Sequence, residues 1–221
     1  MSGENSAHGL FVHCEVVEPF AENARLIGCR RSRVAVLVDP GGRVDQLLAV
    51  AAVEGLEVGA VWLTHAHLDH VTGVGDAVAR LGQIPILLHR DDLSLYEAVA
   101  QQGQMFGLAI DNPPPPTRWL EVGESLALGE LHAQVLHLPG HSPGHVGFWF
   151  ARQQIILLGD VLFAGSIGRT DLPGGDYDTL MNSIWESVLP LGDEVRVLCG
   201  HGPDTTIARE RASNPFLADR A

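Results

Sequence analysis

The segment Thr64-His65-Ala66-His67-Leu68-Asp69-His70 decides how this sequence is interpreted. It follows the apolar run Ala60–Leu63, which predicts a strand, so the segment lies at a strand end, where loops carry functional side chains. Residues two apart in an extended loop project to the same side, so His65 and His67 face one point. The turn that ends the segment faces a second point. Imidazoles and carboxylates are ligands of zinc, iron and manganese, and the spacing therefore predicts a metal site rather than an ordinary polar loop.

Three later segments place further metal-binding side chains just beyond apolar strands. The run LHAQVLHL ends in a glycine-rich turn, PGHSPGH, which is expected to expose His141. The run IILLGD ends in Asp160, and the run VRVLCGHG ends in His201 between two glycines. Strand ends that gather at one edge of a sandwich would bring these side chains together. The repetition predicts one shared site with ligands for more than one ion.

Strands and helices are mixed along the whole sequence, which favours an α/β fold with helices covering sheets. We expect one domain over residues 1–221, with the proline-containing stretch Gln101–Thr117 as a surface loop. The expected strands are FVHCEVV from Phe11, RVAVLVDP from Arg33, AVWL from Ala60, PILLH from Pro85, LHAQVLHL, VGFWFA, QIILLGD and VRVLCGHG. The expected helices are VDQLLAVAAVEG from Val44, Asp76–Leu81, DDLSLYEAVAQQG, DYDTLMNSIWESVLPL and TTIARERAS.

Composition excludes several classes of protein. The formal charge is −13, with 14 basic residues that are all arginine. A surface of that sign repels a phosphate backbone, so no nucleic-acid partner is expected. Three cysteines without close pairing argue against a disulfide framework. The apolar runs are too short to cross a membrane and the start lacks a signal-peptide pattern, so a cytoplasmic location is expected.

The four motifs together carry a family resemblance. THAHLDH, PGHSPGH, GD and CGHG, in this order, resemble the metallo-β-lactamase-fold hydrolases. The complete string is similar to the glyoxalase II branch, in particular to its short single-domain bacterial members of the hydroxyacylglutathione hydrolase type. The similarity spans Phe11 to Pro215. It implies an αββα sandwich with metals at one edge of the two sheets, which agrees with the positions of the strand ends.

The resemblance also implies a ligand set for two divalent metal ions. Zinc is expected first, and iron or manganese would suit the same ligands. The implied ligands are His65, His67 and His141 at the first metal, Asp69, His70 and His201 at the second, and Asp160 as the bridge between them.

Such a site predicts hydrolysis. Two cations about 3.5–4 Å apart lower the pKa of a shared water, giving a metal-bridging hydroxide, and polarise a carbonyl. Asp160 would hold both metals, and the resemblance implies that Asp69 accepts a hydrogen bond from the nucleophile. We therefore expect a dinuclear metallo-hydrolase, a thioester hydrolase whose small-molecule substrates include compounds such as S-lactoylglutathione. These motifs do not specify the physiological substrate or the oligomeric state.

Four alternatives to this function follow from the same residues. A persulfide dioxygenase of the same superfamily would use one iron at His65, His141 and Asp160, and the GRTD stretch from Gly168 suits it. A lactonase is a third enzyme class. A β-lactamase is disfavoured, since those enzymes generally lack the bridging acid that Asp160 supplies. A metal-binding scaffold without turnover is the non-enzymatic alternative, and the complete ligand set argues against it.

Recognition of glutathione is not specified by this sequence. Full-length glyoxalase II enzymes carry a further C-terminal helical region that grips glutathione with basic residues, and we expect no such separate domain here. The chain has no lysine and only three arginines beyond His201. Arg169 is the candidate substrate-binding residue, because a guanidinium can hold a carboxylate with two hydrogen bonds, or it pairs with Asp171 or Asp176.

Several other residues have plainer interpretations. Cys199 is expected to be a small buried strand residue, and His145 either supports a metal-binding loop or packs against it. Met105 and Phe106 form an apolar rim or pack within their own loop. The remaining histidines have no partner at a suggestive spacing, so we expect them to be solvated or satisfied in the core: His8, His13, His89, His132 and His137.

Overall fold

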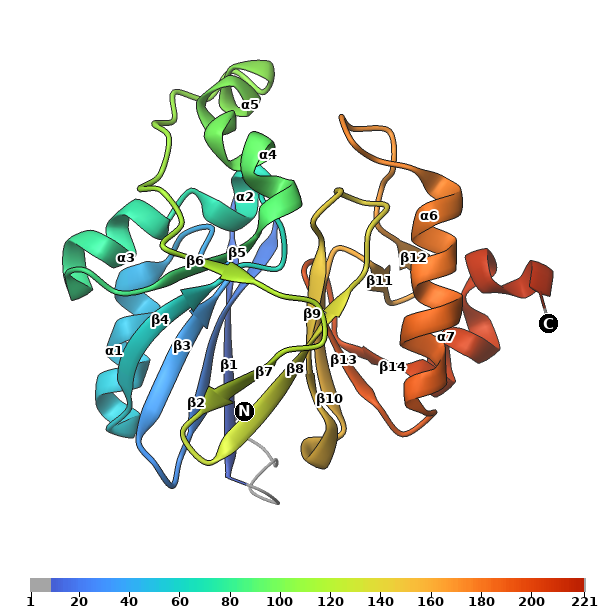
Figure 1. The fold of residues 1–221 in the computed structure, drawn as a ribbon, viewed down its shortest axis with the longest axis horizontal. Coiled ribbons are helices and arrows are strands. Elements are labelled where there is room, and N and C mark those ends of the chain that lie inside the picture. The colour runs from blue at the N-terminus through green and yellow to red at the C-terminus, as the bar shows by residue number, and fades with distance from the viewer. Residues whose placement is uncertain (1–8, 221) are drawn as a thin grey trace.

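The computed structural model describes residues 9–220 as four layers, with two sheets face to face and helices over the outer face of each (Figure 1). The predicted αββα sandwich is confirmed. The first sheet comes from the N-terminal half of the chain and the second from the C-terminal half (Figure 1). His8 lies outside the described residues.

The first sheet has six strands in chain order, antiparallel from β1 to β3 and parallel from β3 to β6. Its strands are β1 (Leu10–Val17), β2 (Glu22–Cys29), β3 (Val34–Val38), β4 (Glu57–Trp62), β5 (Ile86–His89) and β6 (Arg118–Leu120). Its helices are α1 (Val44–Glu54), α2 (Leu68–Val71), α3 (Val74–Leu81), η2 (Arg90–Asp92), α4 (Leu93–Glu97) and α5 (Val99–Met105).

The second sheet has the order β14-β13-β10-β9-β8-β7, in which only β10 and β13 run parallel. Its strands are β7 (Ser125–Leu128), β8 (Leu131–His137), β9 (Val146–Phe150), β10 (Ile155–Gly159), β13 (Arg196–Cys199) and β14 (Thr205–Thr206). The other elements of this half are η3 (Ala151–Gln153), the hairpin β11 (Leu162–Phe163) and β12 (Ser166–Ile167), α6 (Tyr177–Asn182), η4 (Ser183–Val188), η5 (Leu189–Leu191), α7 (Ile207–Ser213) and η6 (Pro215–Arg220).

Strand alternation divides the core into three layers. In β3, Ala35 and Leu37 pack on the helix side, whereas Val36 and Val38 face the second sheet. Phe148 lies in the layer between the sheets and is fully buried. Full burial of such a side chain contributes about 1.5–3 kcal/mol. The two sheets are therefore held in a fixed relation, which fixes their loops at the common edge.

Several elements differ from the sequence-based expectation: the short strands β6, β7, β11, β12 and β14 were not anticipated, and two further differences lie beside the site. The stretch Gln101–Thr117 is not a loop throughout, because α5 extends to Met105. The side chain of Gln102 anchors this helix through hydrogen bonds of 2.8–3.1 Å to Leu68 N, Ala66 O and Leu95 O.

Strand β2 was not anticipated, because its sequence ENARLIGC carries three polar side chains. All eight of its residues are buried. The charged side chain of Arg25 can be buried because it donates hydrogen bonds to Asp204 at 2.6 Å and to Cys199 O at 3.0 Å.

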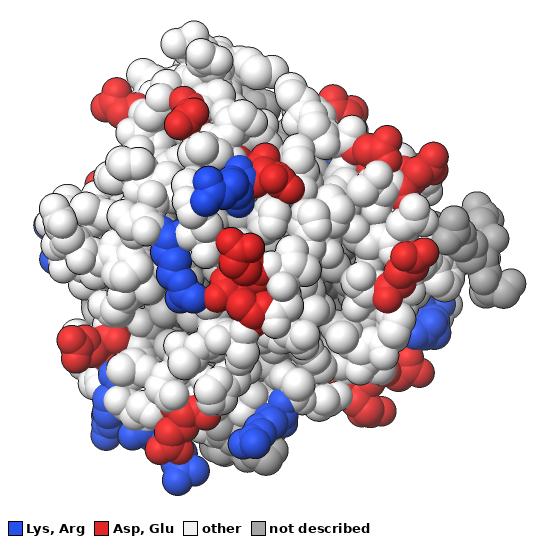
Figure 2. All heavy atoms as spheres, viewed as in Figure 1, with Lys and Arg blue, Asp and Glu red and all other residues white. Residues whose placement is uncertain are grey.

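Within residues 9–220, no helix is long and apolar enough to span a bilayer. On the face of the molecule drawn in Figure 2, acidic and basic side chains are interspersed.

Candidate metal centre

The structure brings all the predicted ligands together at the carboxyl ends of four strands. His65 and His67 follow β4, and Asp69 and His70 lie on the short helix α2. The remaining three follow β8, β10 and β13, at the same edge of the two sheets: His141, Asp160 and His201. The expectation that the glycine turn exposes His141 was wrong, because this side chain is buried between the loops of both sheets.

Three imidazoles form the first group of donors. The nitrogen Nε2 of His141 lies 2.8 Å from Nδ1 of His67 and 3.2 Å from Nε2 of His65. All three rings are buried. Nitrogens that converge this closely crowd their lone pairs together, and a cation at their centre relieves the crowding. Three histidines are a ligand set that zinc and iron accept.

A second group lies beside the first. His201 Nε2 is 3.2 Å from Asp69 Oδ2 and 3.4 Å from His70 Nε2. Asp160 lies between the two groups: one of its carboxylate oxygens is 3.4 Å from His70 Nε2, and the other is 3.5 Å from His141 Nε2. A carboxylate that reaches both groups is placed to connect two ions.

Hydrogen bonds on the far side of the rings aim the donor atoms into the site. Nδ1 of His141 donates to the carbonyl of Arg169 at 2.7 Å, and Nδ1 of His201 donates to the carbonyl of Phe20 at 3.0 Å. Because a carbonyl can only accept, each neutral ring leaves the lone pair of Nε2 free for a metal. Such outer hydrogen bonds fix both the tautomer and the orientation of a ligand.

Asp39 organises the first histidine loop and was not anticipated from the sequence. Its carboxylate accepts from Thr64 N at 2.7 Å and Thr64 Oγ1 at 2.6 Å, and it lies 3.2 Å from His70 Nδ1. Thr64 Oγ1 in turn lies 3.0 Å from His65 Nδ1. The sequence did contain a signal for Asp39, because this residue follows an apolar strand in the same way as Asp160 does.

Asp92 connects the loops of the two sheets and was also not anticipated. Its fully buried carboxylate accepts from the backbone amides of Ala66 and Gly144 at 2.9 and 2.6 Å, and from Ser142 Oγ at 2.8 Å. Burial raises the pKa of Asp92, and these three hydrogen bonds oppose that shift. No spacing along the sequence signals this residue, since its partners lie 26 to 52 positions away.

Two further buried groups lie against the centre. His145 accepts from the amide of Asp160 at 3.1 Å and stacks on His65 with 4.8 Å between ring centroids, so it supports both loops. Glu22 is fully buried, and both its oxygens lack a hydrogen-bond partner within the described chain. Burial raises the pKa of Glu22 well above its usual value, and the neighbouring His70, 4.0 Å away, opposes that shift.

The two groups differ in charge. Burial, reinforced by His141, lowers the pKa of His67 to about 3, so this imidazole is neutral and available as a ligand. Burial also disfavours protonation of His201, but its contacts with Asp160 and Asp69 outweigh burial and raise its pKa to about 10. In the second group, protons on imidazole therefore balance the carboxylates in the place that a metal cation would take.

A cavity of about 390 Å³ opens onto the centre. His67, His141 and His201 form part of its lining, and most of its other walls are apolar. Phe20 and Phe106 meet edge to face, with ring centroids 5.2 Å apart, and Phe106 and Met105 are exposed at its mouth. These last two residues therefore form the apolar rim that was one of their two predicted roles.

Arg169 lines the same cavity, but its guanidinium is already engaged. It makes two parallel bonds to Asp171 at 2.7 and 2.8 Å. The pair is exposed to solvent. Of the two roles predicted for this side chain, the structure shows pairing with Asp171, while its backbone carbonyl orients His141.

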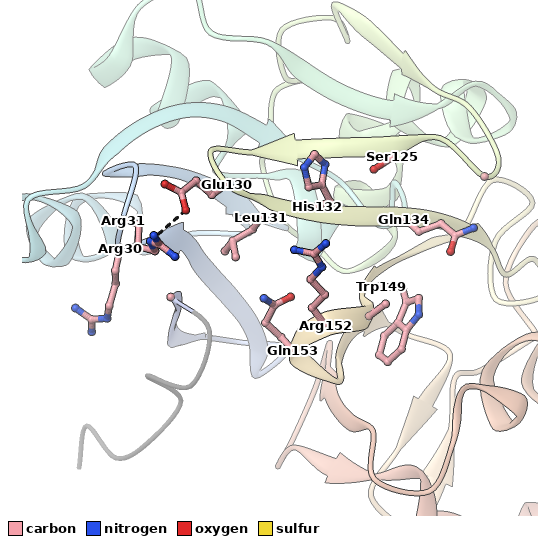
Figure 3. Close-up of a pocket in the computed structure, with 13 residues that line it drawn as sticks. Arg30, Arg31, Ser125, Glu130, Leu131, His132, Gln134, Trp149, Arg152 and Gln153 are labelled. Atoms are coloured by element: carbon pink, nitrogen blue, oxygen red, sulfur yellow. Dashed lines mark ion pairs between the residues drawn. The ribbon is translucent and has the colours of Figure 1, made fainter.

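A larger hollow, of about 940 Å³, lies at the opposite end of the strands, beside the turns β2–β3, β7–β8 and β9–β10 (Figure 3). Arg30, Arg31 and Arg152 contribute to its lining. Arg31 pairs with Glu130 at 3.1 Å (Figure 3), and Arg30 pairs with Glu54 at 2.6 Å. None of the metal-binding clusters in the described chain lines this hollow, so the smaller cavity is the candidate active site.

The sequence model of the metallo-β-lactamase superfamily matches residues 17–201, the span from the end of β1 to the last histidine of the centre. The chain belongs to this superfamily. It is therefore a metallo-β-lactamase-superfamily hydrolase, and its histidine and aspartate clusters offer ligands for the divalent metals that the superfamily binds.

Three known proteins are similar to this chain over nearly its whole length. Hydroxyacylglutathione hydrolase GloC of Haemophilus influenzae is 40% identical over 93% of this chain and 97% of its own length. The crystal structure of BLEG-1, described as a B3 metallo-β-lactamase, aligns with a TM-score of 0.87 and 36% identity over 94% of this chain and all of its own. The di-iron-bound form of TTHA1623 aligns with a TM-score of 0.85 and 45% identity over 93% of this chain and all of its own.

Proposed function

We propose that this protein is a thioester hydrolase that acts on small acyl-thioesters such as S-lactoylglutathione and uses two divalent metal ions, with zinc expected first. One observation carries the proposal: Asp160 lies between two complete groups of donors. Its Oδ2 atom is 3.3 Å from Nε2 of His201 in one group and 3.5 Å from Nε2 of His141 in the other. The similarity to GloC, a hydroxyacylglutathione hydrolase, supports the substrate class. We propose that residues 1–221 act as a single domain in this reaction.

Each predicted ligand has a proposed role that its position supports. The first ion would be held by the three buried histidines His65, His67 and His141, and the second by Asp69, His70 and His201, with Asp160 shared. Bound there, divalent metals supply Lewis-acid polarisation of a carbonyl and lower the pKa of water. Asp69 also lines the cavity, where it can accept a hydrogen bond from the attacking water.

The reaction needs few other groups from the protein. Water adds to the thioester carbonyl carbon, the carbon–sulfur bond breaks, and the thiol leaves as thiolate. A thiolate is a good leaving group, so no strong general acid is required. The apolar rim at Met105 and Phe106 can exclude bulk water while the acyl group lies beside the centre. Because Arg169 is paired with Asp171, this cavity favours small acyl groups over tight recognition of glutathione carboxylates.

Thiol release from S-lactoylglutathione tests the proposal directly. We expect kcat/KM of at least about 10⁴ M⁻¹s⁻¹, which is the low end for an enzyme acting on its own class of substrate. A β-lactam and a lactone, assayed at the same enzyme concentration, should react at least about 100-fold more slowly. Faster β-lactam or lactone cleavage would replace the thioesterase assignment. Oxygen consumption with glutathione persulfide and no thiol release would instead assign the dioxygenase.

A further inference from the structure

A second cluster of metal-binding side chains lies outside the candidate centre. His89 ends strand β5, Asp91 follows it in η2, and His137 ends strand β8. One donor atom from each residue lies within 4.8 Å of the others. The two imidazole rings stack at 4.7 Å between centroids, with 20° between their planes. Sequence spacing gave neither histidine a partner, and the fold places them side by side because the ends of two different sheets meet here.

The hydrogen bonds of this cluster leave metal-binding atoms free. Nε2 of His137 donates to the carbonyl of Pro143 at 3.0 Å, so the neutral ring keeps its lone pair on Nδ1. His89 Nδ1 accepts a long bond, 3.4 Å, from the amide of Asp91, and lies 3.7 Å from the Asp91 carboxylate. The bond to His89 Nδ1 is long, the hydrogen bond of His137 engages only one of its two nitrogens, and the Asp91 carboxylate has no hydrogen-bond donor within the described chain.

Solvent access to the cluster also suits a metal site. The Asp91 side chain is 58% exposed, which gives an ion in solution access to the cluster and lets the carboxylate turn toward it.

We propose that His89, Asp91 and His137 form a third metal site, which binds a zinc-class divalent ion. Two imidazoles and one carboxylate select such transition metals over magnesium and calcium, which prefer oxygen ligands. The fourth coordination position would take water. This site is separate from the proposed catalytic pair and does not depend on the proposed thioesterase activity.

The position of this site gives it a structural consequence. Asp91 precedes Asp92, the carboxylate that bonds Ala66 and Gly144, and His137 bonds Pro143 in the turn that carries His141. An ion bound by His89, Asp91 and His137 would fasten the η2 segment of the first sheet to the β8 end of the second. It would therefore add a second link between the two loops beside the hydrogen bonds of Asp92, without contacting the catalytic pair.

Zinc counting on matched variants tests the proposal. Wild type, His89→Ala, His137→Ala and the control His132→Ala are saturated with zinc, passed through a desalting column and measured by elemental analysis. His132 is an exposed histidine of the same strand β8 as His137 and belongs to none of the described clusters. We expect His89→Ala and His137→Ala each to lose about one zinc per chain, while His132→Ala matches wild type.

Asp91→Asn provides a second measurement that does not depend on the folding of the histidine variants, because Asp91 is exposed. Zinc titration by calorimetry should show one class of site weakened roughly ten-fold. Thiol release should be unchanged in His89→Ala and Asp91→Asn, which separates this site from the catalytic pair. Equal zinc content in His89→Ala, His132→Ala and wild type, or an unaltered titration for Asp91→Asn, would overturn the third site.

Discussion

The carboxylate of Asp92 accepts a hydrogen bond from Ser142 Oγ at 2.8 Å, which links a loop of the first sheet to the turn that carries His141 in the second. The same carboxylate accepts from the amide that precedes His67 and from Gly144 N. One buried acid therefore sets the distance between the two loops that supply the first group of histidines.

Removal of this carboxylate should destabilise the protein and disturb the centre. Asp92→Ala leaves three buried donors without an acceptor, and we expect the free energy of unfolding to fall by about 2–4 kcal/mol. Denaturant unfolding measures the loss, and thiol release measures the effect on the centre. The neighbouring exposed variant Asp91→Asn, compared with Asp92→Ala in chelator-treated protein, is the control. Equal stability of Asp92→Ala and wild type would show that Asp92 does not hold the loops together.

Substitution of the shared acid should separate catalysis from folding. Asp160→Ala removes the contacts to both groups of donors, so we expect thiol release to fall by at least about 100-fold, equivalent to about 2.7 kcal/mol of transition-state stabilisation. Circular dichroism should show that the fold is kept, because apolar clusters between and outside the sheets hold the sandwich together. Full turnover in Asp160→Ala would eliminate the dinuclear mechanism.

The metal-free protein should lose stability as the pH rises. The pKa of His201 is about 10 in the folded protein, above the roughly 6.5 expected in the unfolded chain. Its contribution to stability is thus complete below about pH 6.5 and disappears as the pH approaches about 10. Melting temperatures of the chelator-treated protein across that range measure the effect. His201→Gln should flatten the dependence, and an equally steep fall in this variant would show that His201 is not the group responsible.

The pairing of Arg169 should limit the affinity for anionic substrates. Asp171→Ala releases the guanidinium toward the cavity, and we expect KM for a thioester with a free carboxylate to fall by up to about five-fold, since an exposed ion pair is worth about 1 kcal/mol or less. An uncharged thioester should show no change. Arg169→Ala should alter KM less than about two-fold. A large rise in KM for Arg169→Ala would mean that Arg169 already binds substrate.

The donor positions were predictable because each one follows an apolar strand that can be read from the sequence. His141, Asp160 and His201 all come after such runs, and the parallel or paired ends of neighbouring strands meet at one edge of a sheet. The αββα class followed from the same runs together with the family resemblance. Asp39 fits this rule too and was overlooked.

Other features required the three-dimensional structure. Strand β2 is hidden in the sequence by Glu22, Asn23 and Arg25, which are buried because they meet partners or the centre more than 40 positions away in the chain. The meeting of His89 with His137 depends on how two sheets pack, and local sequence patterns do not encode that distance. The helix predicted over DDLSLYEAVAQQG continues to Met105, and the hydrogen bonds of Gln102 to another loop, which support this end, are not encoded by any local pattern.

Metal content per chain, measured together with S-lactoylglutathione hydrolysis, tests the dinuclear thioesterase most directly. The measurement uses protein purified without chelator or added metal, with His89→Ala in parallel so that an ion at the proposed third site is not counted as catalytic. We predict about two metals per chain in His89→Ala together with thiol release. About one iron per chain without hydrolysis would contradict the dinuclear thioesterase and would identify a mononuclear oxygenase centre instead.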